Sequence, residues 1–387
     1  MRFRFLQTGE AWDAAERNAA LDRIDAWWKA FGATRETILR SFRGEAEWDL
    51  GDWMLDHLGA VDDELMWEFG PGIHKEHRLV ITPESARHLH PLVEVMLQRC
   101  PGYDDWEFYA ARPRESAGHA RAMIEARNLM ALEGARVLAT PTEECFVDLT
   151  FFSESFAGPE DNDAKGSAWV ATGCIVGEET LDVWIGEIHV RHGDGRSEGA
   201  VPLDAMQEAV DAAIERVRAQ LPAEPLWKTL GPGTGTVWQL KPNERDTYPR
   251  RTDLLTCRSC HNPLWTATNS GWVVDSRRYS RFEEIFAYVK MEGLGVLSGD
   301  HFEEKAAIED ALIAALTERE LGAVIGGGTG LRYAYIDLAL AKADEAIETA
   351  IHVLRERNIA RNSWILFFDK RFEQEWVGIW EESPPPP

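Results

Sequence analysis

Apolar residues in the last third of the chain repeat with helical spacing in two segments. In the first segment they are Ile308, Ala311, Leu312, Ala315 and Leu316, at positions i, i+3, i+4, i+7 and i+8. In the second they are Ile347, Ala350, Ile351 and Leu354. This spacing places the apolar side chains on one side of a helix. The pattern therefore predicts two amphipathic helices, each with one face to bury.

Strand patterns alternate with these two helices. Apolar and polar residues alternate over 333–338, and the run 364–368 is continuously apolar, as is typical of a buried strand. The glycine-rich run 326–330 leads into a strand rather than a helix, which favours a β-hairpin or a bulge over a phosphate-binding loop. With a first strand near 294–297, the order is β-α-β-β-α-β. We therefore expect a ferredoxin-like module at the C-terminal end.

The first third of the chain predicts another module of helices and strands. A helix is expected from about 10 to 31, strands at 64–69 and 77–81, a helix over 85–100 and a strand at 105–110. The middle of the chain predicts strands at 145–153, 169–176 and 181–190, followed by a helix over 206–217.

The string HRLVITPESARHLHPLVEVMLQRCPGYDDWEFYAARP in the first module resembles part of a bacterial family of unknown function. The resemblance extends over about residues 64–113. The matching positions are Val80, Ile81, Thr82, Leu92, Val93, Pro101, Trp106, Ala110 and Pro113. These positions are apolar and structural, so the resemblance implies a small α+β module and no catalytic residue.

The predicted fold class is α+β, with tandem small modules whose antiparallel sheets are covered by helices. Changes in composition along the chain suggest where one module ends and the next begins. The expected division is an N-terminal module at 1–113, a second module at 114–222, a Gly/Pro-rich connector with strands at 223–290, a ferredoxin-like module at 291–380 and a disordered proline tail at 381–387.

Composition places the chain among globular proteins. It has 387 residues, of which 44% are hydrophobic, and no apolar run approaches the roughly 18–20 residues needed to cross a bilayer. The N-terminus lacks the apolar core of a signal peptide. The five cysteines are an odd and sparse set, which disfavours a disulfide framework. We therefore expect a cytoplasmic protein with reduced cysteines and no membrane association.

The chain carries a formal net charge of −25, from 66 acidic and 41 basic side chains. Such a charge repels phosphate backbones and anionic membranes, so nucleic acid is not an expected partner. It attracts basic proteins. The basic runs 248–251 and 277–281 are expected to be solvated charges on loops.

A CxxCH motif is the main candidate for metal chemistry. Cys257, Cys260 and His261 match the pattern that attaches haem, but haem attachment requires export. Two thiolates with this spacing supply half of a tetrahedral zinc shell, and His261 could add a third ligand. No second CxxC completes the set. A redox dithiol and ordinary loop cysteines are the other interpretations, and we expect no cofactor.

The chain has 16 tryptophans, and Trp48 and Trp53 lie in a polar stretch without core periodicity. Because aromatic side chains often anchor interfaces, these two are the candidate partner-binding residues. The sequence shows neither a GxSxG elbow nor a paired carboxylate dyad. We therefore expect a non-enzymatic regulator or immunity-type protein that binds another protein. The alternatives are an enzyme or small-ligand sensor with a site between modules, and a zinc protein using Cys257 and Cys260.

Overall fold

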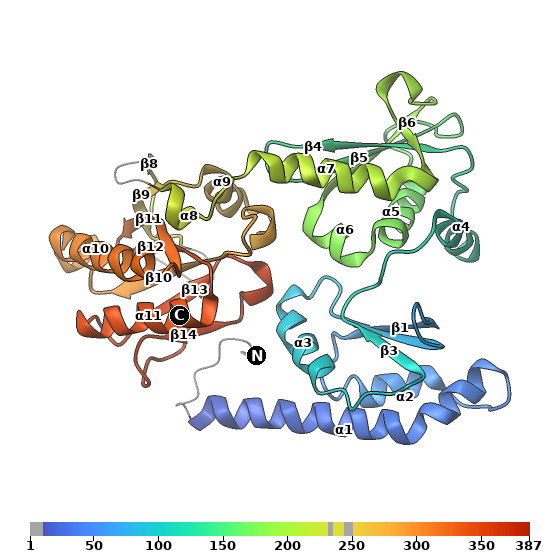
Figure 1. Cartoon of the computed structure of the whole chain (residues 1–387), viewed down its shortest axis with the longest axis horizontal. Coiled ribbons are helices and arrows are strands. Elements are labelled where there is room, and N and C mark those ends of the chain that lie inside the picture. The colour runs from blue at the N-terminus through green and yellow to red at the C-terminus, as the bar shows by residue number, and fades with distance from the viewer. Residues whose placement is uncertain (1–10, 231–234, 244–250, 300) are drawn as a thin grey trace. The chain divides into compact units, whose positions relative to one another are not determined.

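The computed structural model describes residues 11–230, 235–243, 251–299 and 301–387 (Figure 1). The chain divides into two compact units. Unit 1 comprises Met1–Ala111 together with Arg371–Val377, and unit 2 comprises Arg112–Lys370 together with Gly378–Pro387. In these ranges the strands form three sheets, which combine with helices, so the fold is α+β as predicted. The finer division into modules stays a prediction.

Unit 1 is built on a three-stranded sheet of order β1-β2-β3, in which β1 and β2 are antiparallel and β2 and β3 parallel. The long helix α1 contributes Ile24, Trp27 and Phe31 to the core. The predicted strands and the second helix are present to within a few residues. The elements are α1 (Ala11–Phe42), α2 (Leu50–His57), β1 (Met66–Pro71), β2 (His77–Thr82), α3 (His90–Gln98) and β3 (Trp106–Tyr109).

Unit 2 begins with a four-stranded sheet of order β6-β5-β4-β7. Most of its pairs are antiparallel, but β5 and β6 run parallel, because two helices connect them. The elements are α4 (Ala117–Ala126), β4 (Arg136–Pro141), β5 (Val147–Ser153), α5 (Asn162–Val176), α6 (Glu178–Trp184), β6 (Ile185–His192), β7 (Val201–Pro202) and α7 (Met206–Gln220).

The predicted strand at 169–176 is wrong, and the one at 181–190 is only partly right. The first lies in α5, and the second is divided between α6 and β6. Along α5 the buried residues Ala164, Ala168, Ala171 and Ile175 follow helical spacing. Short apolar runs fit a buried helix as well as a strand, and small side chains let this helix pack closely.

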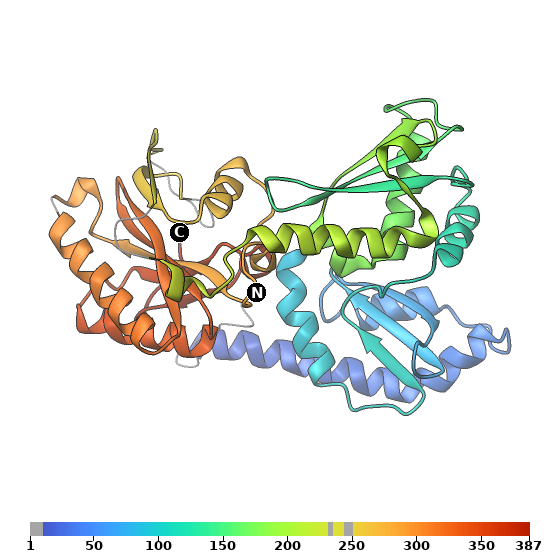
Figure 2. The ribbon, with the colours of Figure 1, turned by 45° about the horizontal axis from the view of Figure 1, so that its top comes forward.

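A seven-stranded sheet of order β14-β13-β10-β12-β11-β9-β8 follows, and its strands other than β14 lie wholly within unit 2. The two amphipathic helices predicted from periodicity are α10 (Phe302–Glu318) and α11 (Ala343–Glu356). They pack against each other and against β11 and β12, as Figure 2 shows. The strands are β8 (Thr236–Gln239), β9 (Leu254–Ser259), β10 (Ile285–Glu292), β11 (Gly322–Gly330), β12 (Tyr333–Leu340), β13 (Ser363–Phe367) and β14 (Trp376–Gly378).

The predicted β-α-β-β-α-β order runs from β10 to β13, with neighbours in the order β13-β10-β12-β11. The position of its first strand was wrong. That strand is β10, whereas the predicted stretch contains a short 3₁₀ turn, Val296–Ser298, between glycines 295 and 299. Because β8, β9 and β14 extend the sheet beyond four strands, the ferredoxin-like assignment stays a prediction.

The glycine-rich run lies inside β11 and not at a turn. The pairing with β12 shifts register between Val324 and Gly326, at the start of the run, as it does at a bulge. A Cβ added at Gly326 would lie 2.2 Å from the carbonyl oxygen of Arg258 in β9, and one at Gly328 would lie 2.6 Å from that of Thr256. The glycines therefore allow β9 to approach β11 closely.

Within the described ranges, none of the helices has the length and apolar character required to span a membrane.

Candidate functional site

The two tryptophans predicted to bind a partner lie against the core of unit 1. Trp53 lies 5.5 Å from Trp27 and 5.6 Å from Trp48 between ring centroids, and it stacks on His57 at 4.5 Å. Both Trp48 and Trp53 are half-buried and pack against the core. These contacts give them a structural role. Their role in partner binding stays a prediction.

The two cysteines of the CxxCH motif lie at the end of β9. Cys257 is buried, and this burial raises the pKa of its thiol to about 11. A protonated thiol is a poor metal ligand, since zinc binds the thiolate. Cys260 is half-buried, and its backbone N–H donates to the carbonyl of Ile325 at 2.7 Å.

The histidine of the motif uses both ring nitrogens within the fold. The backbone N–H of Leu264 donates to Nδ1 of His261 at 3.3 Å, so Nε2 carries the proton and donates to the carbonyl of Tyr279 at 3.0 Å. His261 thereby caps helix α9 (Asn262–Ser270). The part of the chain that the structure describes contains no group of three or more His, Cys, Asp or Glu side chains suited to a metal ion. The zinc site stays a prediction.

Two arginines that were expected to be solvated are buried, so that expectation was wrong for them. The side chain of Arg251 is 8% exposed and forms an ion pair of 2.6 Å with Asp337 in β12. Its guanidinium lies 4.9 Å from the ring centre of Tyr288 and 4.7 Å from that of Phe368. A buried charge requires a partner, and Asp337 provides it. Residues 248–250 of the same run lie outside the described residues.

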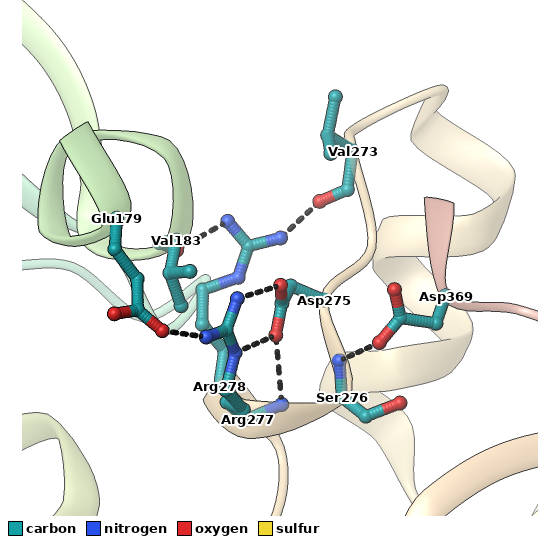
Figure 3. A network of polar contacts seen from close by, with 8 residues as sticks. All are labelled: Glu179, Val183, Val273, Asp275, Ser276, Arg277, Arg278 and Asp369. Carbon is teal, nitrogen blue, oxygen red and sulfur yellow. Dashed lines mark hydrogen bonds and ion pairs between the residues drawn. The ribbon is translucent and has the colours of Figure 1, made fainter. Parts of the chain in front are cut away.

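Arg277 and Arg278 connect α6 to the turn that precedes β10 (Figure 3). Arg277 binds Asp275 through two hydrogen bonds, Nε to Oδ1 at 2.9 Å and Nη2 to Oδ2 at 2.8 Å. Its Nη1 donates to Glu179 in α6. The bidentate geometry fixes the guanidinium plane, so this arginine links two parts of unit 2.

Arg278, the second buried arginine, is fully inaccessible and points toward α6 in Figure 3. Its Nη1 donates to the carbonyl of Val183 at 3.0 Å, and Nη2 donates to that of Val273. The guanidinium stacks on Phe146, 3.7 Å from the ring centre. Val183 lies in the last turn of α6, where a cation complements the helix dipole. Arg278 is therefore closed to solvent, and its contacts stabilise the fold.

An open pocket lies between β9, β11 and the N-terminal turn of α10. Its volume is about 440 Å³, within the range of small-molecule sites. Thr256 and Thr329 lie side by side in its wall, because they are register partners on β9 and β11. The lining residues are Thr256, Leu294, Val296, Gly299, His301, Phe302, Lys305 and Thr329.

Three exposed apolar side chains, two of which line this pocket while the third is their neighbour in sequence, form what we call the apolar rim. They are Val296, Leu297 and Phe302. Leu297 is 78% and Phe302 76% exposed, the highest values among the exposed large hydrophobic side chains of the described residues. Surface apolar side chains that gather in one place mark interaction sites more often than scattered ones do.

A second depression, of about 460 Å³, lies along β6, and its basic side chains have acidic partners. Lys165 faces Glu160 at 3.5 Å, and His189 faces Glu187 at 3.2 Å. Most of the residues that line this depression are charged or polar, whereas the other pocket has three large apolar side chains in its lining. The pocket beside the apolar rim is therefore the stronger candidate.

Comparison of the chain with protein-family models, curated proteins and solved structures gives no match. The candidate site rests on its geometry alone.

Sequence reasoning missed the apolar rim because it assigned Val296 and Leu297 to a strand at 294–297 and made no prediction for Phe302. The signal was present in the glycines at 293, 295 and 299, which interrupt the apolar run. Glycines this frequent favour turns over strands, and a turn between them exposes its apolar side chains.

Proposed function

We propose that this chain is a non-enzymatic, cytoplasmic regulator or immunity-type protein that binds another protein through the apolar rim. The observation that carries the proposal is the exposure of Leu297 and Phe302 within six residues of each other. Covering each of these side chains contributes about 1.5–3 kcal/mol. An anchor of this kind beside a pocket is typical of the energetic centre of an interface.

The charge around the rim supports a basic partner. Glu303 and Glu304 are exposed and directly follow Phe302 in the first turn of α10. The whole chain carries a net charge of −25. Opposite charges accelerate the encounter and orient the partner, while the apolar side chains hold it. The same charge disfavours nucleic acid as a partner.

The test begins with isolation of protein partners on the purified full-length chain at low salt. The affinity of each identified partner is then measured by calorimetry for the native chain and for a Leu297→Ser/Phe302→Ser variant. We expect the dissociation constant to rise at least about tenfold in the variant.

Trp169→Ala is the matched control, because Trp169 is 56% exposed on α5 and is not part of the rim. It should bind as the native chain does. A partner whose affinity is equal for the native chain and the rim variant would contradict the proposal. So would the absence of any captured protein.

A further inference from the structure

Among the described residues that line this pocket, Lys305 is the one Lys, Arg, Asp or Glu side chain. Glu309 accepts a hydrogen bond from Arg258 at 3.1 Å and faces the ammonium of Lys305 at 3.7 Å. One carboxylate therefore serves two cations. Arg258 is the closer partner, and the group of two cations and one carboxylate carries a net positive charge. Its side chain is 15% exposed and lines the pocket.

Hydrogen-bonding groups accompany this charge. The hydroxyls of Thr256 and Thr329 have no hydrogen-bond partner among the described residues, so both are available to a ligand. His301 also lines the pocket, but both of its ring nitrogens form hydrogen bonds within the protein. Nδ1 lies 3.1 Å from Oε2 of Glu304, and Nε2 lies 3.1 Å from the carbonyl oxygen of Ser298. Glu304 is exposed, and it does not line the pocket.

The rest of the pocket is apolar. Leu294, Val296 and Phe302 contribute the large apolar side chains of its lining. A pocket with one partly buried cation, two hydroxyls and an apolar wall favours a ligand with one anionic group and an apolar body.

We infer that this pocket binds a small monocarboxylate with an apolar body, whose carboxylate pairs with Lys305 and accepts hydrogen bonds from Thr256 and Thr329. The inference goes beyond the proposed protein-binding function, because it assigns a small ligand to the pocket whether or not a protein covers the rim. A carboxylate here would also restore the charge balance of the Arg258, Glu309 and Lys305 group.

The test compares three probes of matched shape with the full-length chain. They are 2-naphthylacetate, 2-(2-naphthyl)ethanol and 2-(2-naphthyl)ethylamine, and binding is followed by calorimetry. We expect the carboxylate to bind about tenfold more tightly than the alcohol and the amine to bind most weakly. In Lys305→Met, the carboxylate should lose its advantage while the alcohol binds as before, because the apolar wall is intact.

Lys165→Met is the matched control, since it removes one lysine from the other depression of unit 2 and should leave the preference unchanged. Thr329→Val provides a second variant that keeps the charge and should weaken the carboxylate, because it removes one of its hydrogen bonds. Equal affinity for the three probes, no binding of any probe, or a preference that survives in Lys305→Met would overturn the inference. Leu297 does not line the pocket, so Leu297→Ser separates this site from protein docking: it should weaken the partner and leave 2-naphthylacetate unaffected.

Discussion

Single residues in unit 2 show how burial changes the role of a side chain. His261 resembles a metal ligand in sequence, but both of its ring nitrogens are held by backbone groups. Arg251 and Arg278 resemble loop charges, but one pairs with Asp337 and the other caps α6. These roles depend on residues far away in the chain. Local sequence could not show them, because burial is decided by the packing of the whole sheet.

His261 allows a test of its structural role through pH. Burial lowers the pKa of this imidazole below its ordinary value of 6.5. As pH falls, the unfolded chain therefore binds a proton at this histidine before the folded chain does. The contribution of neutral His261 to the free energy of unfolding is complete above the unfolded pKa of 6.5 and is lost as pH falls through the folded pKa. We expect the free energy of unfolding to fall between pH 7 and about pH 5 in the native chain, measured by urea titration.

His261→Asn should flatten this dependence, because asparagine caps a helix without titrating. His352→Asn, at an exposed histidine of α11, is the control and should keep the native slope. An unchanged slope in His261→Asn would show that another group dominates the acid response.

At the scale of elements, the close approach of β9 and β11 makes the glycines of β11 intolerant of side chains. A Cβ at Gly328 would lie 2.6 Å from both the Thr256 carbonyl oxygen and Cδ2 of Leu254. The backbone there is not left-handed, so the obstacle is crowding. We expect Gly328→Val to lower the free energy of unfolding by about 1–3 kcal/mol, measured by urea titration.

Gly166→Val is the comparison for this variant. Gly166 lies in α5 with no atom within 4 Å of an added Cβ, and valine has a higher helix propensity than glycine. The free energy of unfolding of Gly166→Val should stay within about 0.5 kcal/mol of the native value. If Gly328→Val unfolds at the same midpoint urea concentration as the native chain, the sheet has room for a side chain that the structure does not show.

The elements that sequence predicted well are those with a long, clear period. Both α10 and α11 have apolar positions at helical spacing over more than two turns. The sequence of β12 alternates between apolar and polar or aromatic residues, although all of its residues are buried. The errors fall on short apolar runs, in α5 and in the turn Val296–Ser298, where period alone does not distinguish strand, helix and turn. The rim pocket could not be predicted, since it needs β9, β11 and α10 together.

At the scale of the whole molecule, the formal net charge is a property that can be calculated from the sequence alone. A net charge of −25 acts over distances longer than any single contact. Apolar side chains act only at contact, so the two contributions to partner binding respond to different variables. Salt changes the first, and mutation of the apolar rim changes the second.

This separation predicts how partner binding depends on salt. The Debye length falls from about 10 Å at 0.1 M salt to about 3 Å at 1 M, so attraction to a basic partner weakens. We expect the association rate, measured by surface plasmon resonance, to fall steeply as salt rises while the dissociation rate changes little. The Leu297→Ser/Phe302→Ser variant should dissociate faster at every salt concentration and keep the native slope of the association rate, because its charge is unchanged. An association rate independent of salt would show that the partner is not basic, and a native dissociation rate in the variant would place the contact elsewhere.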